Sequence, residues 1–302
     1  MDRREFIKKS LQAGAASLAM MTMKVPLINS AERTSTVAVA RNGSPDDMVE
    51  KAVEMLGGIA RFVGKGDTVV IKPNIGWARR PEQAANTNPE VVAAIVRLCK
   101  SAGAGKIKVF DNTCNEAKRC YVMSGIQKAA ESAGADVSYM FPQKFKKTDI
   151  PNGKILKSWH FYKDALDADA FINVPIVKHH SLSRMTMGMK NIMGILGENR
   201  GKIHNQFDQK LADINTVVKP TLTILDAVNV LMRNGPVGGN VNDVQSFNTI
   251  VAGVDPVAVD SYGASFFDLK GMDLGFLRKA HAMGLGEIDL SHVKVKEFNL
   301  SG

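Results

Sequence analysis

The chain has 302 residues, of which 45% are hydrophobic and 23% charged, and its formal net charge is +9. These values are ordinary for a globular protein, so they exclude a disordered, a collagen-like and a multi-span membrane protein. Three cysteines exclude a disulfide-stapled scaffold. An aromatic content of 6% and dispersed lysines and arginines argue against a nucleic acid as a partner.

Residues 1–31 have the pattern of a bacterial export signal. Arg3 and Arg4 precede a Phe-Ile-Lys run, and a short, mildly apolar stretch follows from Leu11 to Met23. Paired arginines are typical of the twin-arginine type. We therefore expect the twin-arginine translocase as a partner during export, a periplasmic location, and no stable membrane span after signal cleavage. An ordinary amphipathic helix and an uncleaved anchor are the alternatives.

Residues 32–302 alternate between predicted strands and predicted helices, which indicates a single α/β domain. In chain order, the predicted strands are Thr36–Ala40, Thr68–Ile71, Ile107–Asp111, Val137–Phe141, Ala170–Val174, Thr221–Leu225, Thr249–Ala252 and Val293–Phe298. Helices are predicted after Ser44, Asn88 and Asp255, each of which is a good capping residue followed by proline, and from Ser124 to Ala133. Continuous apolar strands predict a mainly parallel sheet with helices on both faces. The polar segment from Phe141 to Trp159 is interpreted as an insertion or a lid.

Polar side chains end or follow several of the predicted strands. Ligands of open parallel sheets bind beyond the carboxyl ends of the strands, so we expect these side chains to meet at one rim. They are Lys72, Asn74, Asp111, Lys178, His180 and Asp226.

Lysine and histidine at such a rim suit acid–base chemistry on an anion. His180, Lys178 and Lys72 are the candidate catalytic residues, with histidine as the acid or base and the lysines stabilising an oxyanion. Asn74, Asp111 and Asp226 are candidate substrate- or cofactor-binding residues. A structural role remains open for each histidine, and Asp226 could instead hold a turn.

The segment from Met185 to Leu196 has helical spacing. Its methionines form one apolar face, which is typical of a core rather than of a copper site. Lys190 and Asn191 lie on the opposite side, and Arg200, Lys202 and His204 follow. We predict that Lys190, Asn191 and His204 bind a small anionic ligand such as a carboxylate or a phosphate.

Cys114 and Cys120 lie six residues apart, after a predicted strand. A disulfide, a metal site completed by a histidine, and two incidental thiols all fit this spacing. The sequence contains neither a four-cysteine ferredoxin run nor the motifs of nicotinamide dehydrogenases, phosphate-loop nucleotide hydrolases, zinc proteases or serine hydrolases.

Five runs together resemble the domain of unknown function 362 family, in the family's order between about Val37 and Leu290. They are Val70–Asn74, Thr87–Pro89, Ile172–His180, Lys190–Gly194 and Asp255–Asp260. The resemblance implies an association with iron–sulfur proteins, because some members carry ferredoxin-type modules. It also implies a fold distantly similar to nickel-cofactor lactate racemase, in which histidines and lysines serve a carbon-acid reaction.

Two functions are consistent with these features. The first is an exported enzyme of redox or carbon-acid type, dependent on a metal or another cofactor, that acts on a small anionic substrate. The second is a non-catalytic periplasmic binding or maturation factor for a metal, an iron–sulfur cluster or a cofactor. The candidate cofactor is accordingly a metal or an iron–sulfur cluster, and chemical turnover distinguishes the two functions.

Overall fold

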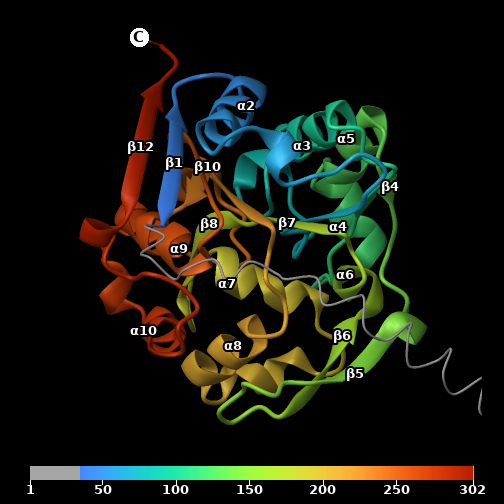
Figure 1. Cartoon of the computed structure of the whole chain (residues 1–302), viewed down its shortest axis with the longest axis vertical. Coiled ribbons are helices and arrows are strands. Elements are labelled where there is room, and N and C mark those ends of the chain that lie inside the picture. The colour runs from blue at the N-terminus through green and yellow to red at the C-terminus, as the bar shows by residue number, and fades with distance from the viewer. Residues whose placement is uncertain (1–34, 302) are drawn as a thin grey trace, which may run out of the picture. The chain divides into compact units, whose positions relative to one another are not determined.

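The computed structural model describes residues 35–301, and the predicted export signal lies outside them. A ten-stranded sheet runs through this part of the chain in the order β12-β1-β11-β10-β7-β2-β3-β4, with β8 paired to β10 and β9 to β8 (Figure 1). Its strands are β1 (Thr36–Arg41), β2 (Thr68–Pro73), β3 (Lys106–Val109), β4 (Asp136–Val137), β7 (Ala170–Val174), β8 (Ile176–His180), β9 (Arg184–Thr186), β10 (Leu222–Leu231), β11 (Val244–Gly253) and β12 (Lys294–Asn299). A separate two-stranded sheet pairs β5 (Phe145–Asp149) with β6 (Ser158–Tyr162).

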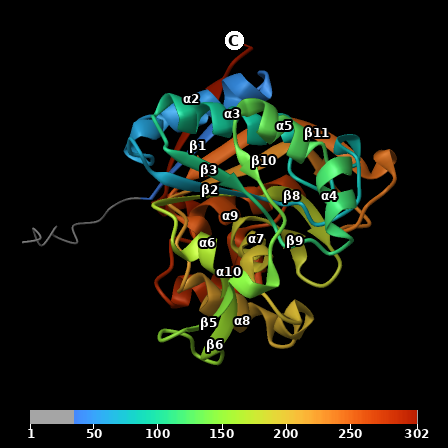
Figure 2. The same cartoon turned by 90° about the vertical axis from the view of Figure 1, so that its right-hand side faces the viewer.

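The sheet buries a separate hydrophobic core on each face. Val37 and Val39 belong to one core, and Ala38 belongs to the other, because successive side chains of a strand point to opposite faces. Helices α2, α3 and α5 cover one face, and α7 to α10 cover the other (Figure 2). The helices are α2 (Pro45–Met55), α3 (Pro89–Ser101), α4 (Ala117–Met123), α5 (Ile126–Ala133), α6 (Lys163–Leu166), α7 (Gly188–Asn191), α8 (Phe207–Asn215), α9 (Pro256–Ala264) and α10 (Gly275–Ala282).

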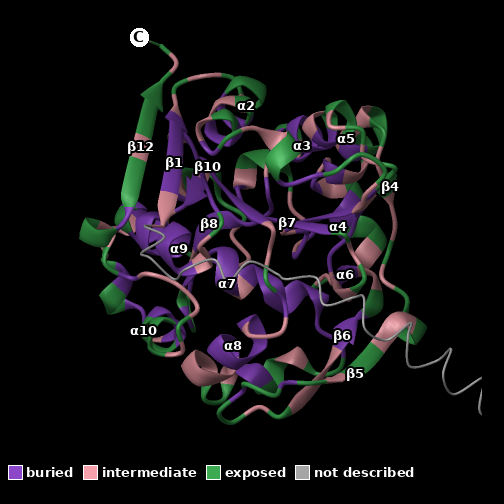
Figure 3. Ribbon diagram, viewed as in Figure 1, coloured by how far each residue is buried: buried purple, intermediate pink, exposed green. Residues whose placement is uncertain are grey.

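The predicted fold class, a mainly parallel sheet covered by helices on both faces, is confirmed. In the ten-stranded sheet, β11 is antiparallel to β1 and β10, and β9 is antiparallel to β8, whereas the other pairs are parallel. The central strands β1, β7 and β10 are buried, and the edge strand β12 is largely exposed (Figure 3). Within residues 35–301, no helix is long and apolar enough to span a membrane.

The predicted helix starts are confirmed. The side chains of Ser44, Asn88 and Asp255 each accept a hydrogen bond from a backbone N–H in the first turn of the helix that follows. In each case proline occupies the first helical position, where a missing N–H leaves no bond unmade.

The predicted strand Ala170–Val174 is confirmed as β7, but the strand that follows it was not predicted. Lys178 and His180 lie inside this strand, β8, because the chain resumes pairing with β10 directly after Pro175. The predicted strand end before Asp226 is wrong. Asp226 lies in the middle of β10, because β10 stays paired with β11 along most of its length.

The predicted helix over the methionine segment is also wrong. The segment begins with β9, the short helix α7 starts only at Gly188, and a 3₁₀ turn follows. Asp260 sets that start, because its carboxylate accepts the backbone N–H of Gly188 at 2.7 Å and of Met189 at 2.9 Å. The methionines are nevertheless buried, so their interpretation as core residues is confirmed.

Further sequence-based expectations differ in detail. Val137–Phe141 contributes only the two-residue strand β4, because pairing with β3 ends at Val137. Helix α4 was not predicted, and the polar segment after Phe141 folds into β5 and the start of β6.

A fully buried ion pair joins the ends of β2 and β3. Lys72 Nζ lies 2.8 Å from Asp111 Oδ1, and it also donates hydrogen bonds to Pro73 O and Asn191 Oδ1. The contact with Asp111 is a charge contact rather than an aligned hydrogen bond, while the other carboxylate oxygen accepts the N–H of Ile75 at 2.6 Å. A Cβ on Gly194 would stand 1.9 Å from Asp111 Oδ1, so only glycine leaves room for this pair.

We expect Lys72→Met to lower the free energy of unfolding by about 3–5 kcal/mol, because it leaves the Asp111 carboxylate buried without its cation. The matched control is Lys106→Met, whose partner Asp136 lies 3.2 Å away with both side chains more than half exposed. That variant should lose less than about 1 kcal/mol. Urea unfolding measures the free energy of unfolding of both variants. Equal losses for the two variants would contradict the stabilising role assigned to the buried Lys72–Asp111 pair.

Candidate functional site

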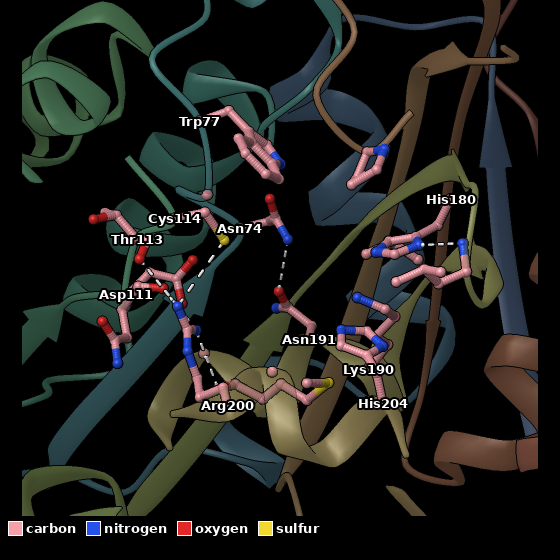
Figure 4. A pocket seen from close by; sticks show the side chains of 18 of the residues that line it. Asn74, Trp77, Asp111, Thr113, Cys114, His180, Lys190, Asn191, Arg200 and His204 are labelled. Carbon is pink, nitrogen blue, oxygen red and sulfur yellow. Dashed lines mark hydrogen bonds between the residues drawn. The ribbon is translucent and has the colours of Figure 1, made fainter. Parts of the chain in front are cut away.

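A cavity of about 650 Å³ opens where β2, β3 and β8 end (Figure 4). All the candidate site residues predicted from the sequence line it except Asp226 and Cys120. The residues brought together are Lys72, Asn74, Asp111, Cys114, Lys178, His180, Lys190, Asn191 and His204. The expectation of a single rim is therefore met in space, whereas the chemical roles assigned to these residues stay predictions.

Asp226 does not line the cavity. Its carboxylate is fully buried and accepts the N–H of Asn88 at 2.7 Å and of Val228 at 3.0 Å. Burial raises the pKa of Asp226 to about 6, while these two hydrogen bonds oppose the shift. The residue ties the start of α3 to β10, which corrects its assignment as a substrate- or cofactor-binding residue.

The residues present do not fit the predicted metal or iron–sulfur site. Cys114 is exposed and Cys120 is buried, and both thiols are free, as is that of Cys99. Within residues 35–301, no three His, Cys, Asp or Glu side chains lie close enough together to hold a metal ion. An iron–sulfur cluster requires several cysteine ligands, so neither Cys114 nor Cys120 is retained as a metal ligand.

Lys72 and Lys178 are both buried beside the cavity, but their surroundings differ. Lys72 faces a carboxylate, whereas Lys178 Nζ contacts only neutral oxygens, those of Ala85 O, Pro236 O and Asn74 Oδ1. Burial and the nearby charge of Lys190 lower the pKa of Lys178 to about 7. Burial also lowers the pKa of Lys72, while Asp111 opposes that shift. Lys72 is buried against Asp111 and donates to Pro73 O and Asn191 Oδ1, so the geometry favours a structural role for this lysine over the predicted catalytic one.

Lys190 is the lysine available to a ligand. It lies on α7, next to Asn191, and its ammonium has no ion-pair or hydrogen-bond partner among residues 35–301. Burial lowers the pKa of Lys190 to about 8, with Arg200 and Lys72 adding to the shift and Cys114 opposing it. At pH 7 roughly a tenth of the molecules therefore carry this side chain as a free amine, and the fraction reaches about half near pH 8.

The surroundings of His180 favour a hydrogen-bond donor over the acid–base role that the sequence predicted. Its Nδ1 accepts the backbone N–H of Leu182 at 3.1 Å and, more weakly, that of Ser183 at 3.4 Å. This arrangement assigns the ring proton to Nε2. Burial and the surrounding cations, Lys190 first among them, lower the pKa of His180 to about 2. The ring is neutral at physiological pH, and its Nε2–H is a hydrogen-bond donor.

His204 and Arg200 lie on a short 3₁₀ segment, on opposite sides of the cavity. His204 stacks on Phe207 with ring centroids 5.4 Å apart, and burial and Lys190 lower its pKa. Arg200 donates to Asn112 O at 2.9 Å and to Thr113 O at 3.0 Å. Figure 4 shows Arg200 beside Cys114 and Asp111, with His180, Lys190 and His204 across the cavity.

Several lining residues were not identified from the sequence. Thr186 is buried with its hydroxyl unpartnered among residues 35–301, and Trp77 and Leu182 also line the cavity. Thr186 enters the site because β9 folds back on β8 and places it opposite Lys178. The alternation of polar and apolar residues from Arg184 to Met187 was the available sequence signal for the second strand of this hairpin.

The cavity carries an excess of positive charge. Two lining residues are acids: Asp111 is paired with Lys72, and Glu198 lies 2.7 Å from His160 Nδ1. Within residues 35–301, Lys178, Lys190 and Arg200 have no carboxylate within ion-pair distance. A positive cavity with walls of low polarisability concentrates small anions from solution.

Comparisons with known proteins give relatives in sequence and in fold. The chain is 31% identical over 216 residues to a thylakoid-associated protein of Synechocystis sp., an alignment that covers 69% of this chain and 65% of that protein. The lactate racemase apoprotein of Thermoanaerobacterium thermosaccharolyticum has a TM-score of 0.46 at 13% identity, covering 76% of this chain and 56% of its own. A Thermotoga maritima protein has a TM-score of 0.38 at 10% identity, covering 81% and 60%. The two structural similarities are too low to bear on chemistry.

Residues 69–265, more than half of the chain, match the family described as "Domain of unknown function (DUF362)". This span is shorter at both ends than the resemblance read from the motifs. It contains β2 from Val69 on, α7, β10 and the residues that line the cavity. The chain belongs to the DUF362 family.

Proposed function

We propose that the protein is an enzyme that binds a small carboxylate in the cavity and moves a proton at the carbon beside the carboxylate or an adjacent carbonyl. The observation that supports this most directly is Lys190, an unpartnered lysine with a lowered pKa, facing a neutral histidine donor. A base poised near neutral pH and a donor for a developing oxyanion are the two groups that such a reaction needs.

Each residue has a distinct role in this reaction. Lys190 Nζ, as the free amine, takes the proton from carbon, and the electron pair left behind is delocalised onto the substrate oxygen. His180 Nε2–H donates a hydrogen bond to that oxygen as its charge grows. Arg200 supplies the positive charge that holds the carboxylate and favours the anionic intermediate, and Lys178 adds to this charge while it is protonated, below its pKa of about 7. The ammonium of Lys190 then returns a proton to carbon, so no redox partner is consumed.

The test is exchange of carbon-bound hydrogen for deuterium in D₂O, followed by NMR on a panel containing a 2-hydroxy, a 2-oxo and a 2-amino acid of three carbons. Lys190→Arg keeps the positive charge but supplies no base near neutrality. We expect it to lower exchange by about 10²- to 10⁴-fold while carboxylate affinity changes less than about threefold. Lys190→Met should lose both exchange and affinity.

The pH dependence follows from the sign of the Lys190 shift. Exchange should rise with pH through the pKa of about 8, because only the free amine accepts a proton. Affinity for the carboxylate should fall over the same range, because the ammonium is lost. Lys202→Arg, an exposed neighbour outside the cavity, is the matched control and should change neither. Carboxylate binding without exchange in the wild-type protein would favour the non-catalytic binding function instead.

Cys114 offers an independent probe of the cavity's charge. It is exposed, whereas Cys99 and Cys120 are buried, and its Sγ lies 4.0 Å from Arg200 Nη2. The measured quantity is the ratio of the labelling rate with iodoacetate to that with iodoacetamide. At low salt we expect this ratio to be about tenfold higher for Cys114 than for free cysteine, because the cations attract the carboxylate of iodoacetate. Mass spectrometry locates the label. Lys190→Met removes one of the cations and should lower this rate ratio, whereas the control variant Lys202→Met should leave it unchanged. A rate ratio equal to that of free cysteine would contradict an anion-attracting cavity.

We also propose export by the twin-arginine route, based on residues 1–31 alone. Replacing Arg3 and Arg4 together by lysine should trap the precursor in the cytoplasm, because the translocase recognises the arginine pair. Fractionation and immunoblotting measure the distribution of the protein. Unchanged export in a strain without that translocase would refute this proposal and leave the proposed reaction untouched.

A further inference from the structure

A second cavity, of about 570 Å³, lies directly beside the first. Its apolar lining comes from three elements: Ile155 precedes β6, Phe207 begins α8, and Leu274 and Phe276 stand at the start of α10. Polar side chains from Arg184, Asp208 and Lys279 also border it. This groove therefore has apolar walls and a polar rim of two cations and one acid.

Leu182 connects the two spaces. It lines both cavities, and it is 72% exposed although it stands next to the buried ring of His180. Behind it, His180, His204, Phe207 and Phe276 form a continuous row, with successive ring centroids 5.9, 5.4 and 6.0 Å apart. The row begins at the proposed reaction site and ends in the groove.

We propose that the natural substrate is an amphiphilic monocarboxylate, with its carboxylate among the cations of the first cavity and an apolar chain or ring in the groove beyond Leu182. The inference rests on the proposed function, because the carboxylate end is the one that the cations hold. Charge complementarity fixes which end enters the first cavity, and the shared wall at Leu182 gives the tail a continuous path. A tail there removes Leu182 and Ile155, two of the exposed large apolar side chains, from water.

The experiment compares the affinities of acetate, butanoate, hexanoate and octanoate for the wild-type protein, measured by calorimetry. Each added methylene that enters an apolar groove should tighten binding about two- to fourfold, so octanoate should bind far more tightly than acetate. Leu182→Asn and Ile155→Asn should each reduce the octanoate-to-acetate affinity ratio by about three- to tenfold. Asparagine is used because it removes the apolar surface without changing the charge.

Two controls separate the possible outcomes. Val122→Asn removes an equally exposed apolar side chain, 61% exposed, that lines neither cavity, and it should leave the affinity ratio unchanged. Lys190→Met should weaken every member of the series, because all share the carboxylate. Octanoate bound as tightly by Lys190→Met as by the wild type would show adventitious apolar binding and overturn the inference.

The failure of this inference is distinguishable from the failure of the proposed function. If all four carboxylates bind with the same affinity, the groove is not a substrate subsite, but the cationic cavity still binds carboxylates. If acetate and its longer homologues all fail to bind, the proposed function itself falls, and the groove proposal falls with it.

Discussion

The buried contact between Lys72 and Asp111 is the constraint on which the site depends. Lys72 also donates to Asn191 Oδ1, while Asn191 Nδ2 donates to Lys72 O and to Asn173 Oδ1. This reciprocal bonding fixes α7 against the ends of β2 and β7, and Asp260 holds the other end of the same short helix through the N–H groups at its start. Lys190 precedes Asn191, so its backbone is held by anchors on both sides while its ammonium stays free.

The same constraint explains why the cavity is positive. Asp111 lies within reach of several cations, but its charge is matched to Lys72, and the peptide N–H of Ile75 occupies its other oxygen. Lys178 and Lys190 are left in a poorly solvated space without a carboxylate, and their lowered pKa values express that cost. Such an arrangement is unfavourable, and the anion that we propose for the cavity would relieve it. Strongly shifted pKa values are typical of functional sites for this reason.

The sequence predicts the frame of this site better than its chemistry. Proline after Ser44, Asn88 and Asp255 locates helix starts because the signal is local, and the strand ends converge because parallel strands share one edge. The roles depend on long-range contacts that no local pattern carries. The start of α7 is set by a carboxylate more than seventy residues further on, at Asp260. Asp226 lies outside the predicted site because pairing with β11 continues β10 beyond this residue. The tautomer of His180 could not be predicted either, because it is set by the backbone N–H groups of the turn that follows this residue.

That turn joins the chemistry of the cavity to the shape of the groove. The backbone N–H of Leu182 donates to His180 Nδ1, which leaves the Nε2–H free to donate to the proposed ligand, while the Leu182 side chain lines both cavities. A substrate tail that packs against this side chain presses on the same residue whose N–H orients the histidine. Binding energy from the unreactive end of the substrate is thereby available to position the donor at the reactive end, so the tail should affect the rate of proton transfer as well as affinity.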